Sequence, residues 1–193
     1  QMFKQGLCSW SLSALLASFC MAQSGFAADY EIDPSHSAAQ WEISHLGMST
    51  MVGRFNTFSG QFSWDRDNPG GSSISVQVDT ASIDSNWAER DKHLRSAKFL
   101  DVEKYPISTF ESGTYTGDAS QGKLVGQLTL HGVSKEVTME VVVIGEGNDP
   151  WGGYRAGFNA STTINRSDFG VTEFLGPASE TMTLQFYIEG TRK

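Results

Sequence analysis

The sequence predicts an all-β domain of about eight antiparallel strands, interrupted by one short helix. Apolar and polar side chains alternate along seven runs between residues 39 and 188, as in strands with one buried face. Clusters of Gly, Pro, Asn and Asp separate several of these runs and indicate turns. One densely charged segment, 86–100, breaks the alternation and favours a helix.

The first 27 residues are expected to be a secretory signal peptide, outside the fold. Lys4 is their only charged side chain, and a mostly apolar stretch follows it over residues 7–21. Small residues end the segment, with cleavage expected after Ala27. The apolar stretch is too short to span a bilayer about 30 Å thick. We therefore predict export to the periplasm, no stable membrane span, and a single mature domain over 28–193.

The alternating runs place apolar residues on one face of each expected strand. The residues of these faces are Ala39, Trp41, Ile43 and His45; Phe58, Gly60, Phe62 and Trp64; Ile74, Val76, Val78 and Thr80; Leu124, Gly126, Leu128 and Leu130; Val137, Met139, Val141 and Val143; Phe158, Ala160, Thr162 and Ile164; and Met182, Leu184, Phe186 and Ile188. Gly60, Gly126 and Ala160 are small for buried positions. They either leave an internal cavity or mark the bends that close a barrel.

The helix is expected to run from Asn86 to about Leu100. Asn86 followed by Glu89 resembles a capping box, and Pro106 is expected to stop the helix. About eight strands and one helix fit either a closed barrel or a two-sheet sandwich. The alternation alone does not choose between these two architectures.

The charged run 89–95 within this helix has two interpretations. It can form a solvated helix with pairs such as Asp91 with Arg95, four residues apart. Alternatively, Arg90 and His93, three residues apart, point from one face at an anionic group. The composition alone favours the solvated helix.

The charge and the cysteines restrict the function. Thirteen basic and 22 acidic residues follow residue 28, a net charge of −9, which argues against nucleic acid and anionic membrane surfaces as partners. Cys8 and Cys20 both lie in the expected signal peptide. The mature chain therefore has no thiol for catalysis, disulfides or metal binding. Its length of about 165 residues is enough for one domain to bury a core.

Known catalytic motifs are missing from the sequence. There is no phosphate-binding loop, no nucleophile elbow and no paired-histidine zinc motif. The four histidines, at positions 36, 45, 93 and 131, are scattered and are expected to be surface or capping residues. No serine lies in a recognisable strained turn for a Ser-His-Asp site. We therefore predict neither a metal nor a cofactor.

Several motifs resemble the YceI family of periplasmic polyisoprenoid-binding proteins. They are Asp33-Pro34-Ser35-His36-Ser37, Trp41-Glu42-Ile43-Ser44-His45-Leu46-Gly47, Val52-Gly53-Arg54-Phe55, the tract from Asp79 through Glu89-Arg90-Asp91-Lys92-His93-Leu94-Arg95-Ser96 to Tyr105-Pro106, Leu128-Thr129-Leu130-His131-Gly132, and Asp168-Phe169-Gly170. The resemblance covers essentially all of 29–193. It implies an eight-stranded, lipocalin-like β-barrel whose tunnel holds a long polyprenyl or similar lipid, with the polar head near an opening.

We expect the ligand to be bound by two groups of residues. The apolar lining is expected to include Trp41, Phe55, Phe62, Phe110, Leu128, Val141 and Phe158. The head group, if anionic, is expected to meet Arg54, Asn86, Arg90 and His93, with His45 also at the site. Arginine suits phosphate oxygens because its guanidinium donates paired hydrogen bonds.

Three classes of function remain after this reasoning. The first is a lipid carrier or sequestering protein that is not an enzyme. The second is an enzyme that acts on such a lipid, with His45 or His93 as general base. The third is a structural or interaction domain with a solid core. The sequence also leaves a homodimer open.

Overall fold

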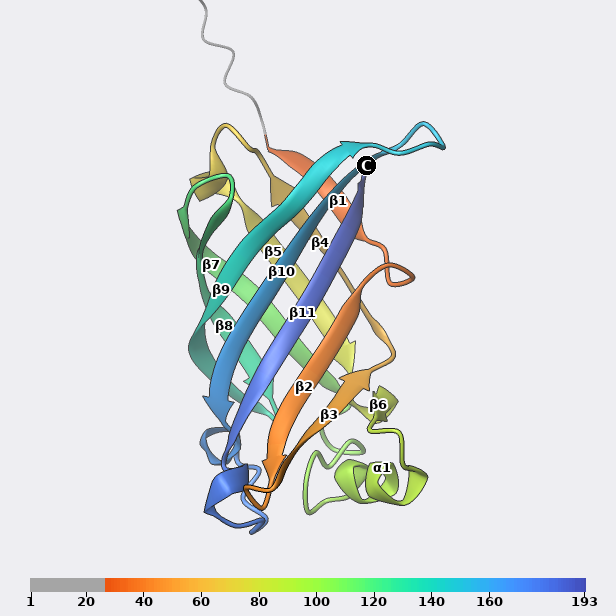
Figure 1. Cartoon of the computed structure of the whole chain (residues 1–193), viewed down its shortest axis with the longest axis vertical. Helices are drawn as coiled ribbons and strands as arrows, with labels where there is room; N and C mark the ends of the chain where they lie inside the picture. The colour runs from red at the N-terminus through yellow and green to blue at the C-terminus, as the bar shows by residue number, and fades with distance from the viewer. Residues whose placement is uncertain (1–26) are drawn as a thin grey trace, which may run out of the picture.

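The computed structural model describes residues 27–193 and consists mainly of strands (Figure 1). In chain order the elements are β1 (Ala28–Ile32), β2 (Ala38–His45), β3 (Ser49–Phe55), β4 (Phe58–Trp64), η1 (Pro69–Gly71), β5 (Ser73–Asp79), η2 (Thr80–Ser82), β6 (Ile83–Asp84), α1 (Ala88–Arg95), β7 (Ile107–Gly117), β8 (Gln121–Leu130), β9 (Val133–Asn148), β10 (Tyr154–Asn165), η3 (Arg166–Phe169), η4 (Pro177–Ser179) and β11 (Thr181–Arg192). The expected signal peptide, apart from its last residue, lies outside the described residues. Within 27–193, no helix is long and apolar enough to cross a membrane.

Eight of the strands close into an antiparallel barrel. The ring runs β1–β4–β5–β7–β8–β9–β10–β11, and β11 pairs back to β1 (Figure 1). This confirms the predicted all-β class with one short α-helix. Of the two architectures that the alternation left open, the chain forms the barrel.

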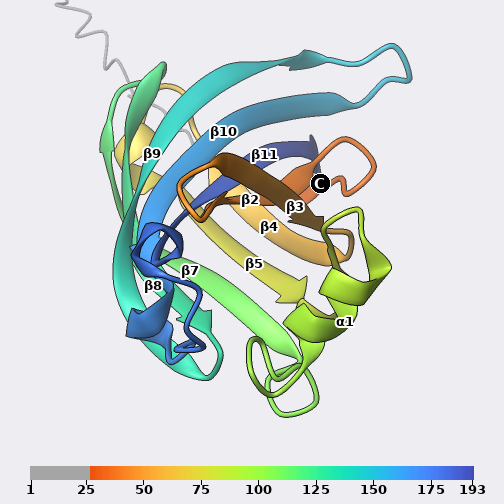
Figure 2. The same ribbon diagram turned by 60° about the horizontal axis from the view of Figure 1, so that its bottom comes forward.

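One edge of β11 is shared by two strands. It pairs with β2 along Met182–Tyr187 and with β1 along Gly190–Arg192. β3 and β6 then continue the sheet beyond β2, and α1 contacts β6. At the end of the barrel that carries α1, the wall therefore includes a helix and loops as well as strands (Figure 2).

The alternation of apolar and polar residues did not predict β7, because this strand contains a bulge. Its register with β8 shifts between Ser112 and Thr114. Phe110 and Tyr115 are five residues apart, an odd spacing that would place them on opposite faces of a regular strand. The bulge brings both rings into the same core cluster.

Gly60 and Gly126 do not leave an internal cavity. A Cβ on Gly60 would lie 2.2 Å from the Ser75 carbonyl oxygen, and one on Gly126 would lie 2.5 Å from the Phe110 ring. Both positions are small because a neighbour approaches the backbone closely. Ala160, by contrast, lines a cavity.

The helix is shorter than predicted and has a different start. α1 covers Ala88–Arg95, and its N-cap is Trp87, whose side chain makes no capping hydrogen bond. Asn86 has a left-handed backbone (φ 64°), and its N–H donates to the Asp84 carboxylate. The predicted capping box is therefore wrong, because Asn86 belongs to the turn before the helix.

The expected ion pair between Asp91 and Arg95 is also wrong. Asp91 is buried and accepts hydrogen bonds from the Ser85 N–H (2.7 Å) and hydroxyl (2.5 Å). Arg95 donates to the carbonyls of Ala81 and Ile83. Both side chains turn toward segment 81–85 and hold the helix against it.

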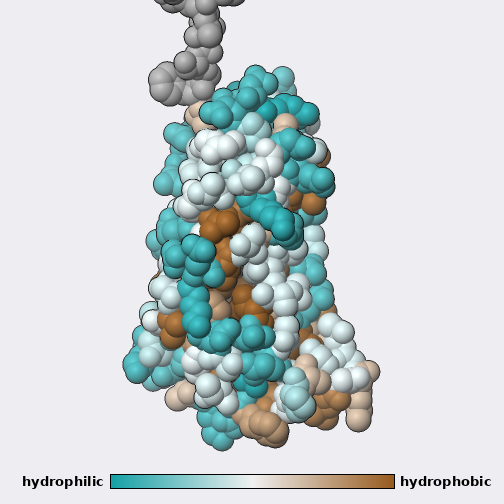
Figure 3. Space-filling model, turned by 90° about the vertical axis from the view of Figure 1, so that its left-hand side faces the viewer, coloured by the Kyte–Doolittle hydropathy of each residue, from teal (hydrophilic) through white to brown (hydrophobic). Residues whose placement is uncertain are grey.

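The interior divides into two apolar clusters. One, toward α1, includes Trp41, Phe110 and Leu128. The other contains Tyr30 and Phe62, whose rings stack with centroids 4.8 Å apart. The outer surface differs between the two ends of the barrel. In Figure 3 the upper end, where the described chain begins, is mainly hydrophilic, and apolar side chains gather in the middle and lower parts of the view.

Candidate functional site

The α1 half of the barrel contains a cavity of about 150 Å³. Its wall is almost wholly apolar and comes from seven strands of the sheet, from α1 and the segment after it, and from η3 and the loop that follows. The strand residues that line it include Trp41, Ile43, Met51, Phe55, Val76, Val78, Phe110, Leu128, Met182, Leu184 and Phe186. A cavity of this size with an apolar lining is expected to stay dry and to bind apolar groups.

A larger space of about 620 Å³ lies at the barrel mouth beside this cavity. The two spaces share Ile43, Met51, Leu94, Phe99 and Leu175 in their walls. The mouth also has polar side chains in its wall, which the inner cavity largely lacks. An amphiphile could thus place its apolar chain inside and its polar head at the mouth.

A third space, of about 70 Å³, lies farther along the barrel and is bordered by Phe62, Val141 and Phe158. Phe55, Phe158 and Phe186 are only partly buried, and each packs against both core clusters. These rings therefore lie where the two core clusters meet. Phe55 and Phe186 line the 150 Å³ cavity and Phe158 lines the 70 Å³ one, and the two spaces share no wall residue.

The structure brings the predicted apolar residues into the interior. Trp41, Phe55, Phe110 and Leu128 line the 150 Å³ cavity. Phe62, Val141 and Phe158 line the 70 Å³ cavity. The predicted lining is thus divided between two separate spaces.

The predicted polar residues are only partly brought together. His45, Arg90 and His93 all line the mouth. Arg54 is exposed on the outer face of β3, opposite Asp84 in the register with β6. Asn86 is exposed in the turn before α1, and neither it nor Arg54 borders the three interior spaces.

The mouth contains residues that the sequence reasoning did not name. Trp87 and Phe174 come from irregular segments, where alternation gives no signal. Ile43, Met182 and Leu184 were on the predicted inward faces, and the strand period could have identified them as lining residues. Leu94 lies in α1 and Phe99 in the segment after it, and both line the inner cavity and the mouth.

Arg90 is held in place by several contacts at the mouth. Its Nε donates to the Ser85 hydroxyl (2.7 Å), and a terminal nitrogen donates to the Ser85 carbonyl (2.6 Å). The other terminal nitrogen lies 3.7 Å from the Met51 sulfur, and the guanidinium lies over the Trp87 ring. These contacts leave N–H donors on a fixed cation at the polar edge of the pocket.

Arg166 is a buried cation that also lines the inner cavity. It donates to the Ser179 and Val171 carbonyls, both at 2.8 Å. Its charge faces Glu180, whose pKa is lowered, mainly by a hydrogen bond from the Ser167 hydroxyl. Arg166 therefore holds the two ends of the loop 166–180 together.

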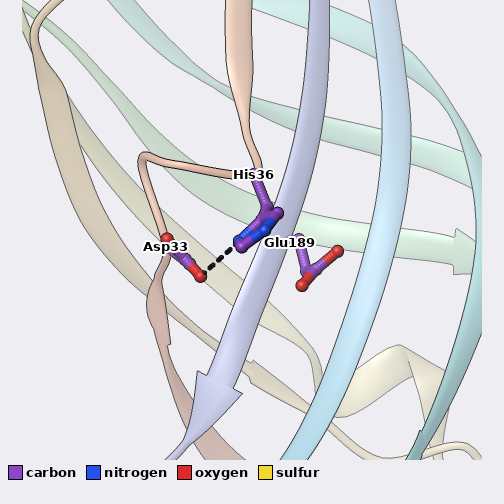
Figure 4. A group of neighbouring side chains, drawn as sticks. All are labelled: Asp33, His36 and Glu189. Carbon is purple, nitrogen blue, oxygen red and sulfur yellow. Dashed lines mark hydrogen bonds and ion pairs between the residues drawn. The ribbon is translucent and has the colours of Figure 1, made fainter. Parts of the chain in front are cut away.

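A separate polar cluster lies at the turn between β1 and β2. Asp33, His36 and Glu189 have the spacing of metal ligands among the described residues (Figure 4). However, Arg155 already donates to Asp33 (2.8 Å) and to Glu189 (2.7 Å). The cluster is therefore an ion-pair network in which the guanidinium supplies the cation.

This network shifts the ionisation of its members. The Ser35 hydroxyl, Arg155 and His36 hold the pKa of Asp33 well below its usual range. Hydrogen bonds to Asp33, Glu189 and Asp149 raise the pKa of Arg155. The network ties the β1–β2 turn to β10 and β11.

The same turn does not form a Ser-His-Asp triad. The His36 Nδ1 contacts both the Ser35 hydroxyl (3.1 Å) and the Asp33 carboxylate (2.8 Å). In a triad the serine and the carboxylate bind different ring nitrogens, because one nitrogen takes the serine proton while the carboxylate orients the ring through the other. The arrangement is therefore a local hydrogen-bonded turn.

Comparison with known proteins gives relatives over the full length of the chain. A UPF0312 protein of Pseudomonas paraeruginosa is 45% identical over 194 residues, covering 100% of both chains. Among solved structures, BcnA of Burkholderia cenocepacia superposes with a TM-score of 0.74 at 22% identity, covering 82% of this chain and 98% of that one. A polyisoprenoid binding domain from Saccharophagus degradans superposes with a TM-score of 0.66 at 16% identity, covering 86% and 99%.

At these low identities, the two structural similarities establish the barrel fold. The full-length relative and the domain match also assign the family, because both extend over the barrel. Residues 30–190 match the YceI-like domain, and this chain belongs to the YceI-like family.

Proposed function

We propose that this protein binds a long-chain isoprenoid, or a similar amphiphilic lipid, inside the barrel and carries or sequesters it in the periplasm. The observation that carries the proposal is the adjacency of an apolar inner cavity and a polar-edged mouth. The solved domain from Saccharophagus degradans, which shares the fold, is described as binding polyisoprenoid. The expected signal peptide over 1–27 supports the periplasmic location.

The apolar chain is proposed to occupy the space bordered by Trp41, Phe55, Phe110 and Leu128 and to extend toward Phe158. Burial of hydrocarbon stabilises such a complex by about 0.8 kcal/mol per CH₂. A chain of ordinary lipid length then needs few polar contacts to bind. This fits a cavity whose lining surface is almost wholly apolar.

The polar head is proposed to lie at the mouth near Arg90, His93 and His45. Arg90 is the strongest candidate because its guanidinium is already oriented by Ser85 and Trp87. A fixed cation loses less entropy when it binds an anion than a mobile one does. Arg54 and Asn86, by their position, are the weaker members of the predicted set.

Organic extraction of the purified secreted protein, followed by mass analysis of the extract, tests the proposal. We expect a prenyl or other long-chain lipid in stoichiometric amount. An empty extract, together with no binding of added farnesol, would contradict it. Incubation of the loaded protein tests the enzyme alternative, because chemical change of the lipid would indicate turnover and an unchanged lipid supports a binding protein.

A further inference from the structure

The rim of the barrel mouth exposes large apolar side chains from three separate segments. Leu46 (56% exposed) and Met48 (83%) lie in the β2–β3 turn, Trp87 (60%) precedes α1, and Phe174 (85%) lies in the loop between η3 and η4. We call these four residues the mouth rim. Figure 2 shows the three segments around the same end of the barrel.

The mouth rim is continuous with the apolar interior. Leu46, Trp87 and Phe174 line the mouth, and the mouth shares wall residues with the inner cavity. Exposed apolar groups that gather around one opening usually mark an interaction surface. Here the surface leads directly into the proposed lipid site.

The charges near the rim differ from those of the rest of the protein. Segment 84–105, which contains α1, carries five basic and five acidic side chains. The described chain as a whole carries 13 basic and 22 acidic ones. The α1 side of the mouth therefore has no net charge of its own, so repulsion at an anionic surface comes from the acidic residues elsewhere in the protein.

From these observations we infer that the mouth rim inserts into the surface of a phospholipid bilayer, so that lipid passes between membrane and barrel without crossing water. The inference rests on the proposed function and adds the partner to it. Tryptophan suits this position because its ring sits at the level of the lipid head groups. Leu46, Met48 and Phe174 would enter the adjoining hydrocarbon.

Co-flotation of the ligand-free protein with phosphatidylcholine vesicles tests this inference. A rim variant carrying Leu46→Ser, Met48→Ser, Trp87→Ser and Phe174→Ser is expected to bind the vesicles at least about tenfold more weakly than the unmodified protein. Trp151→Ser is the matched control, because Trp151 is 79% exposed in the β9–β10 connection and does not border the mouth. It should bind like the unmodified protein.

Addition of phosphatidylglycerol to the vesicles should weaken binding at low salt, and added salt should reverse the effect, because the net charge of the protein is negative. Equal flotation of the rim variant and the unmodified protein would overturn the inference. So would a dimer, seen in sedimentation equilibrium, that the rim substitutions dissolve, because the rim would then be an interface between two copies.

The outcome for the membrane surface is separable from the outcome for lipid binding. Farnesol binding is measured on the same unmodified protein without vesicles. Farnesol binding without vesicle binding would overturn the rim inference alone. Vesicle binding without farnesol binding would overturn the proposed function alone.

Discussion

Trp41 and Gly53 show how a single pair shapes the cavity wall. They are direct partners in the register of β2 and β3, and the indole lies flat over the glycine. A Cβ on Gly53 would lie 2.1 Å from the Trp41 ring. The Trp41 Nε1 is buried without a hydrogen-bond partner among the described residues. The position of the indole is therefore decided by packing.

Gly53→Ala should displace the Trp41 ring toward the cavity. We expect a loss of about 1–3 kcal/mol in the free energy of unfolding, since overpacking costs this much in a filled core, and weaker lipid binding. Gly145→Ala is the control, because its Cβ would meet nothing within 4 Å. Urea denaturation and farnesol titration provide the measurements, and equal behaviour of the two variants would contradict the packing role.

Asp33 makes the stability of the β1–β2 turn depend on pH. Its folded pKa is lowered, first by the Ser35 hydroxyl and then by Arg155. The ionised form therefore stabilises the fold above the unfolded pKa of about 4, and this contribution is lost as the pH falls from there through the folded pKa.

Asp33→Asn should thus destabilise the protein near pH 7, and the difference from the unmodified protein should shrink as the pH falls below about 4. Urea denaturation over that range measures it. Asp67→Asn, on an exposed loop residue, is the control. A difference that stays constant with pH would show that the carboxylate charge is not what Asp33 contributes.

At the scale of an element, α1 is held by polar contacts more than by an apolar face. Ser85 lies at the centre of these contacts, since it binds both Asp91 and Arg90. Arg95 adds two hydrogen bonds to the preceding segment. Leu94 packs against the core. The charged run therefore fixes the helix at the mouth, which neither sequence interpretation included.

Arg90→Ala should lower the affinity for a lipid with an anionic head about ten- to a hundredfold, the value of a charge-assisted contact. Lys92→Ala, on an exposed residue outside the mouth wall, should change it little. Titration with farnesyl pyrophosphate and with farnesol separates the effects. Because Arg90 also binds Ser85, an equal loss for both ligands would mean that the substitution only loosens the helix.

At the scale of the whole molecule, the length of bound chain depends on whether the inner spaces join. The 150 Å³ and 70 Å³ cavities lie in different halves of the barrel. They share no wall residue, and the partly buried rings of Phe55, Phe158 and Phe186 border one or the other. We expect a long chain to displace side chains between the two spaces, whereas a short chain fits in the first.

Ala160→Phe should fill the 70 Å³ space and select against long chains. We expect solanesol binding to fall and farnesol binding to stay within about twofold. Thr163→Phe, on the exposed face of the same strand, is the control. Equal loss for both prenyl alcohols, or no loss for either, would mean that the chain does not reach Ala160.

The strand period by itself predicted the all-β class and the inward faces. Hydrophobic burial acts on every second residue of a strand, so Trp41, Leu128 and Val141 could be placed inside without coordinates. The charged tract was recognised as a helix for the same reason, since it lacks that period. The family followed from the motifs and was confirmed by the domain match.

Tertiary structure decided what depends on contacts between distant segments. Closure of the barrel requires β11 to pair with β1 across almost the whole chain, and nothing in the local alternation specifies that partner. The bulge in β7 reset its period, and Ser85 turned Asp91 and Arg90 away from the expected pairs. Likewise Arg54 faces outward and Trp87 joins the mouth, because these positions follow from register and loop path, which local sequence pattern does not encode.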